Sequence, residues 1–451
     1  MKTSRIIPLL AAVILLSCSG KDRIVTKVEG GRIEGLVSDG TAIFRGIPYA
    51  APPTGGLRFA PPSEIRPWKG VRDATRFGNA ALQDFITDGL YYKEFYASGL
   101  PTLSEDCLYL NIWAPKEAVG SKRSRLPVVL WLHGGSFDHG WSWEPPMSGE
   151  AWTREGVIMV SANYRVGIPG FMAHPALTAE QGTSGNYGIL DQIAALRWIR
   201  DNISAFGGDG ENITVAGQSA GAISVKYLLA SPEAGHLISK AIIQSGGGLE
   251  RRISAYPDTQ GGADSLGKAI ADISGIKTAG QLRNTLWEEL KASYSAVTAG
   301  NWMMFMPHID SVTIVKDFPE AVADGSIADV PIMIGWVKAD GDVLGGKAVT
   351  DFCTLRSSLS DKPVFSYLFS RDLPGEGPGE PDPGAFHSSE MWYTFGTLDK
   401  CWRPFTEGDR ELSRRMVSAW TSFIKKGHPG GLWRPYTQDD PYIEQFDVPT
   451  P

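Results

Sequence analysis

Cysteine is scarce in this chain, and the spacings that bind zinc or form redox pairs are absent. Only four cysteines occur among the 451 residues. Cys18, Cys107, Cys353 and Cys401 match no zinc-binding or dithiol pattern. Once the N-terminal Cys18 is set aside, three remain, so outside the cytosol at least one thiol stays free. Cys353 and Cys401 could form a disulfide, which the sequence alone does not decide.

Basic clusters and repeats are lacking as well. The formal net charge is −7 at pH 7, and no block of Lys or Arg occurs beyond the extreme N-terminus. Because phosphate binding needs a concentrated basic face, nucleic acid is not an expected partner. The composition, 42% hydrophobic and 21% charged, excludes disordered, collagenous and multi-pass membrane proteins. No repeat or interdomain linker interrupts residues 18–451, so we expect one domain, with a loop at Pro374–Gly384.

One apolar run stands at the N-terminus. Ile6 to Leu16 follows Lys2 and Arg5, which is typical of an export signal and too short to span a bilayer. It ends in Leu15-Leu16-Ser17-Cys18, which resembles the lipobox of bacterial lipoproteins. The resemblance implies that residues 1–17 are a lipoprotein signal peptide. Cys18 would then be lipidated and anchor an exported protein to the cell envelope, as a periplasmic or outer-membrane lipoprotein. An ordinary signal peptide is the alternative.

Beyond this segment, apolar β-type runs alternate with helical patterns. This alternation is typical of a mostly parallel sheet covered by helices on both faces. The expected strands are Pro127–Leu132, Val157–Ala162, Ile213–Ala216, Ala241–Gln244, Val330–Gly335 and Val364–Phe369. The expected helices are Gly188–Ile203, Ala220–Leu229, Gly262–Ile273 and Glu407–Lys425.

A candidate nucleophile stands between one of these strands and the helix that follows it. Residues 217–221, Gly-Gln-Ser-Ala-Gly, fit the G-x-S-x-G pattern, which chance alone would produce about 0.5 times in a chain of this composition. The context makes it informative, because a strand-to-turn-to-helix junction strains the backbone and exposes the hydroxyl of the central serine. The sequence therefore predicts Ser219 as a nucleophile.

Backbone donors and a base are needed beside such a serine. Trp131–Phe137 reads as a strand entering a Gly-rich turn, where N–H groups can face a developing oxyanion. The expected donors are the N–H groups of Gly135, Ser136 and Ala220. Of the seven histidines, His387 follows the last expected strand through a long loop, the place of the base in the chain order Ser, acid, His. His139 is a candidate for the pocket wall.

The acid should follow a strand between the serine and the histidine. Val330–Gly335 is such a strand, and it leads to Asp340 and Asp342. Either carboxylate could orient the imidazole and stabilise its charged form. The spacing alone does not separate them.

The match goes beyond isolated motifs. The chain resembles the type-B carboxylesterase (cholinesterase-like) family over about residues 27 to 447, in stretches that follow the order of that family. Besides residues 217–221, the matching stretches are Phe44–Ala50, Ser104–Trp113, His133–Phe137, Asn163–Gly167, Gly185–Gln192, Phe206–Asp209 and Phe386–Glu390. The resemblance implies an α/β-hydrolase fold and a serine carboxylesterase that hydrolyses small-molecule esters through an acyl-enzyme.

The resemblance also implies roles for single residues. Asp340 takes the position of the acid, with Asp342 as the alternative, and completes a triad with Ser219 and His387. Gly135, Ser136 and Ala220 match the oxyanion positions. Ser245 matches a serine that supports the triad from behind. No metal or organic cofactor is implied, because the triad and the backbone donors suffice.

Three departures from the family pattern stand out. The acid is Asp where Glu is usual, and Gln218 replaces the usual Glu beside the nucleophile. Cys107 lacks its usual disulfide partner, since residue 81 is Ala, and is expected to be a buried free thiol. Only 387 − 340 = 47 residues separate acid and base, which implies a reduced helical cap and a more open cleft.

The sequence says less about the substrate and about functions other than ester hydrolysis. An aromatic wall of the pocket could come from Trp141, Trp143, Trp336, Trp392 and Tyr393, although core packing explains each of them equally well. A binding protein without catalysis would be favoured by loss of the serine or the histidine, and a lipase by a long apolar lid. Neither feature is present. The acyl length, the physiological ester and the oligomeric state stay open.

Overall fold

The computed structural model describes residues 22–97, 99–250, 254–299, 305–342, 344–375 and 383–448. The expected signal peptide at 1–17 and the anchor at Cys18 lie outside these residues, as does the middle of the loop expected at Pro374–Gly384. No helix in the described part of the chain is both long enough and apolar enough to cross a membrane.

One sheet of twelve strands forms the centre of the described structure. Its order is β1-β2-β3-β5-β7-β6-β8-β9-β10-β11-β12, with β4 paired to β2. From β7 to β12 every neighbouring pair is parallel, whereas β1, β2, β3 and β5 join by antiparallel pairing. The strands are β1 (Arg23–Val28), β2 (Gly31–Ser38), β3 (Thr41–Pro48), β4 (Val71–Asp73), β5 (Tyr109–Pro115), β6 (Leu126–Leu132), β7 (Ile158–Ala162), β8 (Gly208–Gln218), β9 (Lys240–Gln244), β10 (Ile332–Val337), β11 (Val364–Phe369) and β12 (Ile443–Phe446).

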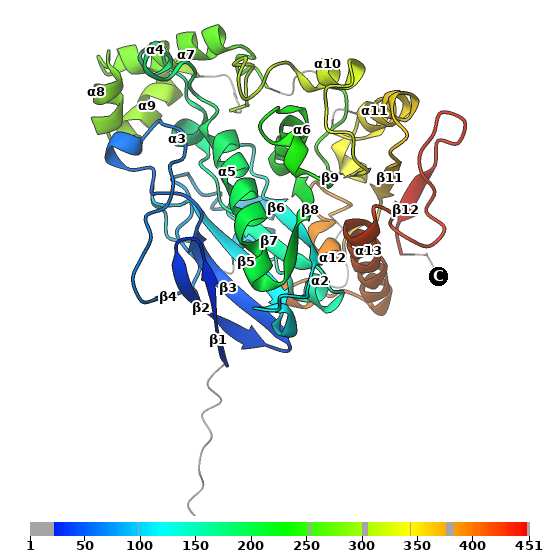
Figure 1. Ribbon diagram of the computed structural model, residues 1–451. Coiled ribbons are helices and arrows are strands. Elements are labelled where there is room, and N and C mark those ends of the chain that lie inside the picture. Colours follow the sequence, from blue (N-terminus) through cyan, green and yellow to red (C-terminus); the bar gives the residue numbers. More distant parts are fainter. Residues whose placement is uncertain are drawn as a thin grey trace, which may run out of the picture.

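Helices cover both faces of this sheet (Figure 1). Contacts place α5, α6, α10 and α11 over one face and α2, α12 and α13 over the other, while α4, α7, α8 and α9 gather beside the sheet. The helices are α1 (Gly89–Tyr91), α2 (Glu150–Arg154), α3 (Gly167–Phe171), α4 (Pro175–Gln181), α5 (Tyr187–Asn202), α6 (Ala220–Ala230), α7 (Gln260–Ile273), α8 (Ala279–Asn284), α9 (Trp287–Val297), α10 (Phe318–Ala323), α11 (Gly346–Leu359), α12 (Met391–Thr394) and α13 (Glu407–Lys426).

The strands and helices expected from the sequence occur within a few residues of their predicted bounds. One difference has a simple cause: β10 begins at Ile332 rather than at Val330. Pro331 lies between them and has no N–H to donate to a neighbouring strand. The other difference is at β8, which extends back to Gly208 instead of starting at Ile213.

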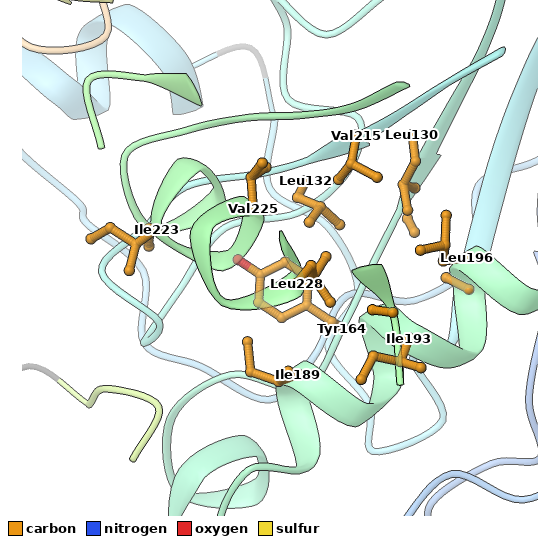
Figure 2. Packing of buried hydrophobic residues seen from close by; sticks show 14 of the residues in the cluster. Leu130, Leu132, Tyr164, Ile189, Ile193, Leu196, Val215, Ile223, Val225 and Leu228 are labelled. Carbon is orange, nitrogen blue, oxygen red and sulfur yellow. The ribbon is translucent and has the colours of Figure 1, made fainter. Parts of the chain in front are cut away.

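A packed apolar layer joins α5 and α6 to the sheet (Figure 2). Leu132 of β6 and Val215 of β8 are fully buried, as are Leu196 of α5 and Leu228 of α6. Removing such side chains from water contributes about 1.5–3 kcal/mol each to folding. Because the same strands end at the turns that carry the candidate catalytic groups, this layer fixes the positions of those turns.

Candidate active site

Ser219 lies in a sharp turn between β8 and α6. Its φ of 56° is unusual for a residue with a side chain, and such strain persists only where the surroundings enforce it. Here the Ser219 N–H donates to the carbonyl of Gln244 on β9, and its carbonyl accepts from Ile223 in α6, both at 2.9 Å. The turn thus holds the hydroxyl of Ser219 at the end of the sheet where parallel strands end.

Close packing behind the turn explains its glycines. A Cβ at Gly221 would lie 2.1 Å from the carbonyl oxygen of Leu132, at the end of β6. Real Cβ atoms do not approach backbone that closely, so only glycine lets α6 begin directly against β6. This contact sets the distance between Ser219 and the loop that follows β6.

That loop carries the expected backbone donors. Gly135 has a φ of 104°, and Ser136 also lies in the left-handed region with a φ of 55°. Within the described residues, the N–H groups of Gly135, Ser136 and Ala220 donate no hydrogen bond to other backbone groups. All three residues line the same cavity as Ser219. Free donors that converge beside a nucleophile are the arrangement that stabilises an oxyanion.

The structure brings His387 and Asp340 together from two different loops. His387 Nδ1 lies 2.6 Å from Asp340 Oδ1. The Asp340 side chain is fully buried, whereas 24% of the His387 side chain is exposed. Asp342 is exposed at the surface. Of the two carboxylates that the sequence left open, the geometry therefore places Asp340 against the imidazole.

The charges around the imidazole change its acidity. Desolvation lowers the pKa of His387, but the hydrogen bond and the charge of Asp340, together with the charge of Glu390, outweigh it, so the net pKa is raised. Glu390 is fully buried, and burial and the charge of Asp340 raise the pKa of Glu390 to about 7. No sequence pattern had marked Glu390 as part of the site.

Gln218 and Ser245, the two neighbours expected to support the triad, differ in what they contact. Gln218 Nε2 lies 3.4 Å from His387 Nε2, so the amide that replaces the usual carboxylate touches the imidazole directly. Ser245 lies at the end of β9 with a φ of 52°, and its N–H donates to the carbonyl of Gly335. Its buried hydroxyl has no hydrogen-bond partner in the described part of the chain.

A cavity of about 480 Å³ lies above Ser219. Its wall includes Ser219, His387, Asp340, Gln218 and the three expected oxyanion donors. It also includes His139, as the sequence suggested, and a segment that no sequence pattern had marked. That segment contains α1 and the π-helical turn Tyr92–Tyr96, and contributes Tyr91, Phe95 and Tyr96 to the wall. The hydroxyl of Tyr91 donates to the carbonyl of His387 at 3.2 Å.

The aromatic wall is therefore not the one suggested by the sequence. None of the five tryptophan and tyrosine residues considered there lines the cavity. Trp392, for example, is buried, and its indole N–H donates to Glu94 at 2.9 Å. Trp143 stacks on Phe77 with ring centroids 4.9 Å apart. Both side chains find their partners away from the cavity, which neighbourhood in the sequence cannot reveal.

The cysteines of the described chain are all unpaired. Cys107 is 1% exposed, which agrees with the buried thiol expected from its missing partner. Cys353 and Cys401 form no disulfide; Cys353 is buried in α11, and the Cys401 thiol donates to Glu94 at 3.6 Å. Among the described residues, no group of three His, Cys, Asp or Glu side chains is arranged to hold a metal ion.

Comparison with known proteins agrees with this architecture. The model of the carboxylesterase family matches residues 22–354 and 342–450. Para-nitrobenzyl esterase of Bacillus subtilis (strain 168) is 34% identical over 466 residues, covering 90% of each chain. Fumonisin B1 esterase of Sphingopyxis macrogoltabida is 38% identical over 351 residues, covering 77% of this chain and 61% of that protein.

Solved structures show the same fold. A thermophilic PNB esterase superposes with a TM-score of 0.83 at 31% identity, covering 94% of this chain and 96% of that one. The two family-model matches overlap at residues 342–354, shortly after Asp340. The fold expected from the sequence is thereby confirmed. The chain belongs to the carboxylesterase family and is a carboxylic ester hydrolase with an α/β-hydrolase fold.

Proposed function

We propose that the protein is a serine carboxylesterase that works through an acyl-enzyme on Ser219. The observation that carries this proposal is the 2.6 Å contact between His387 Nδ1 and Asp340 Oδ1, in the same cavity as Ser219. A carboxylate that accepts from Nδ1–H leaves Nε2 free to take a proton.

Acylation begins with attack of Ser219 Oγ on the carbonyl carbon of the ester. His387 Nε2 takes the hydroxyl proton, and the buried Asp340 stabilises the imidazolium that forms. The oxyanion accepts hydrogen bonds from the N–H groups of Gly135, Ser136 and Ala220. Collapse of the tetrahedral intermediate expels the alcohol, which takes the proton from His387.

Deacylation repeats these steps with water. His387 removes a proton from the water that attacks the acyl carbon. The second intermediate then collapses to the carboxylic acid as its bond to Ser219 Oγ breaks, and Oγ takes the proton from His387. In the described structure no hydrogen bond joins Ser219 Oγ to His387 Nε2, and Gln218 lies beside Nε2 instead. Such bonds are often long without substrate and shorten in the complex, so we expect the imidazole to turn from Gln218 to Ser219 on binding.

Hydrolysis of p-nitrophenyl acetate and butyrate tests the proposal. Ser219→Ala should abolish hydrolysis, and mass spectrometry after rapid quenching should find the acyl group on the wild-type peptide that contains Ser219. Ser265→Ala is the matched control, since Ser265 is exposed on α7 and its hydroxyl only donates to Gly261. Equal activity in wild type and Ser219→Ala would overturn the assignment of the nucleophile. A folded but inactive wild type would favour a binding protein.

We also propose, from the sequence alone, that Cys18 carries a lipid that anchors the protein in the cell envelope. Expression in a bacterial host with labelled palmitate should label the full-length chain but not the Cys18→Ala variant. An unlabelled wild-type chain that is nevertheless cleaved and exported would instead favour an ordinary signal peptide.

A further inference from the structure

Ser388, the residue after the proposed base, has a backbone conformation that disfavours a side chain. Its φ is 75°, in the left-handed region that glycine adopts far more easily than other residues. In the described chain, three residues with a side chain and a positive φ line the active-site cavity, namely Ser136, Ser219 and Ser388. The first two are an oxyanion donor and the nucleophile of the proposed mechanism. Ser388 has no role in that mechanism.

The contacts of the neighbouring peptide groups explain the conformation of Ser388, but not its side chain. The carbonyl of His387 accepts from the Tyr91 hydroxyl at 3.2 Å. The carbonyl of Ser388 accepts from the N–H of Met391, also at 3.2 Å. These bonds hold the chain on both sides of Ser388 and so keep its φ in the strained region. Because glycine would form the same turn without this strain, the serine needs an explanation of its own.

The hydroxyl of Ser388 is not used within the turn. Serine hydroxyls in turns often bond to nearby backbone groups, but in the described structure the Ser388 hydroxyl has no hydrogen-bond partner. Ser388 is only partly buried and lines the cavity. Ser389, in contrast, is fully buried and lies outside the cavity wall. An unpaired hydroxyl beside the base is therefore available to a group of the substrate.

The other polar groups of the wall favour an uncharged partner. Within the described residues, the cavity lining contains no Lys or Arg. Burial lowers the pKa of His139 to about 4 and raises that of Glu144 to about 8, so both side chains are mainly uncharged at pH 7. An ionic substituent of the substrate would lose its hydration there without gaining a counter-charge, whereas a hydroxyl finds partners.

The position next to His387 indicates which part of an ester Ser388 meets. When the tetrahedral intermediate collapses, His387 gives its proton to the oxygen of the leaving alcohol. The alcohol therefore lies beside the imidazole, while the oxyanion faces the N–H groups of Gly135 and Ser136. A hydroxyl on the next carbon of that alcohol stands close to the bond that breaks. The Ser388 hydroxyl can donate to it or accept from it.

We propose that Ser388 binds a second hydroxyl on the leaving alcohol, so that the enzyme prefers monoesters of vicinal diols, such as acylated polyols, to esters of simple alcohols. The inference rests on the proposed function, because it takes His387 as the base. It adds a residue that determines specificity to a triad that does not need it for the reaction. A water molecule that bonds Ser388 in place of the substrate is the alternative occupant.

Two esters of nearly the same size test this preference. In 2-hydroxyethyl butyrate, a hydroxyl replaces the terminal methyl group of the alcohol in propyl butyrate. The wild-type protein should hydrolyse the hydroxyl ester with a kcat/KM about 2- to 10-fold higher, the effect of one hydrogen bond. The rates are followed by titration of the released acid at constant pH. Each rate is divided by the rate of the same ester with hydroxide, which removes the difference in chemical reactivity.

Variants of Ser388 identify the hydroxyl as the cause. Ser388→Ala keeps the Cβ and the strained backbone but removes the hydroxyl, so the corrected ratio of the two esters should fall to about one. Ser388→Gly should give the same ratio without lowering Tm, since it relieves the strain. Ser389→Ala is the matched control, because it removes a buried hydroxyl that has no partner in the described chain and does not line the cavity. It should keep the wild-type ratio.

A third ester separates the two sides of the substrate. Propyl 3-hydroxybutyrate carries its hydroxyl on the acyl group, so Ser388→Ala should leave its rate relative to propyl butyrate unchanged. A wild-type ratio of about one for the two butyrates overturns the inference, as does a preference that persists in Ser388→Ala. An equal loss on all three esters in this variant also overturns it, because Ser388 would then only shape the turn.

Failure of this inference is separate from failure of the proposed function. Hydrolysis of p-nitrophenyl acetate, whose alcohol has no second hydroxyl, tests the nucleophile by itself. A protein that hydrolyses this ester but does not distinguish the two butyrates would retain the proposed function and lose the role of Ser388. A folded protein that hydrolyses none of these esters would lose both.

Discussion

Asp340 is the residue at which a shorter side chain replaces the usual glutamate. Its carboxylate still reaches the imidazole, because the two loops involved are tied together: the N–H of Ala339 donates to the carbonyl of Ala385 at 3.1 Å. The second oxygen of Asp340 accepts from the N–H of Val337 at 3.0 Å. The backbone thus compensates for the missing methylene, and the carboxylate keeps one orientation.

Asp340→Asn should lower kcat for p-nitrophenyl acetate by about 10⁴-fold, because the amide no longer favours the tautomer and the charged form that the base needs. Asp342→Asn, two residues away and exposed, should leave kcat within about twofold, since surface substitutions rarely matter. Steady-state kinetics of the two variants, with circular dichroism to check folding, measures this difference. A larger loss in Asp342→Asn would reverse the assignment of the acid.

The pH profile reports the charge of His387. The imidazole must be neutral to accept a proton, so kcat/KM should fall as the pH drops through the pKa of His387, which lies above its ordinary 6.5. Glu390→Gln removes one of the charges that raise this pKa, so the acidic limb should move to lower pH. The profile is measured with a neutral substrate between pH 5 and 9. A limb that stays in place would mean that Glu390 does not act on His387.

At the scale of elements, one contact determines where the nucleophile stands. α6 begins directly against the end of β6, with no room for a side chain at Gly221. The segment of α1 and the π-helical turn adds a second constraint, since Tyr91 bonds the backbone of His387. The site is therefore assembled from element ends, and its geometry depends on how closely those ends approach one another.

Gly221→Ala should separate α6 from β6 and displace Ser219, because the new methyl group would stand 2.1 Å from the Leu132 carbonyl. Esterase activity should fall by at least about 10²-fold, as expected for misplacement by about 1 Å. Gly261→Ala in α7 is the control, since nothing lies within 4 Å of the added atom and alanine favours helices. The esterase rates and the thermal unfolding of the two variants are compared. A Gly221→Ala protein that keeps its esterase activity would contradict the packing argument.

The whole molecule holds together groups that are distant in the chain. Arg165, on the connection after β7, forms a buried ion pair with Asp191 of α5 at 2.7 Å, and also donates to the carbonyl of Ala60. Each partner leaves an uncompensated charge in the interior if the other is removed. This pair locks α5 against the loop beside the oxyanion turn.

Asp191→Asn should lower the free energy of unfolding by about 3–5 kcal/mol, the usual effect of breaking a buried pair. Asp209→Asn is the matched control. Its partner Arg125 is 70% exposed, so the loss should stay within about 1 kcal/mol. Urea unfolding followed by tryptophan fluorescence compares the two. Similar losses in both variants would show that the buried pair contributes no more than a surface one.

Much of this fold was predictable because hydrophobic pattern and turn chemistry are local. The strands from β6 to β11, the helices α5, α6, α7 and α13, and the turn at Ser219 are each formed by one contiguous stretch of sequence and were predicted. Helices α2 and α11, which follow β6 and β10, were not predicted. His387 and the oxyanion loop were identified as candidates for the same reason. The choice between Asp340 and Asp342 was open because both follow one strand two residues apart, and only the fold decides which faces the imidazole.

The sequence by itself determined the family, the fold class and the candidate nucleophile, since each depends on residue types at short and fixed spacings. Tertiary structure alone decided the wall of the cavity. Tyr91, Phe95 and Tyr96 precede Ser219 by more than a hundred residues, yet they line the same cavity, and Tyr96 packs against Trp141 on the loop after the oxyanion turn with ring centroids 5.0 Å apart. Which side chains line a cavity depends on contacts between distant segments, which no local pattern encodes.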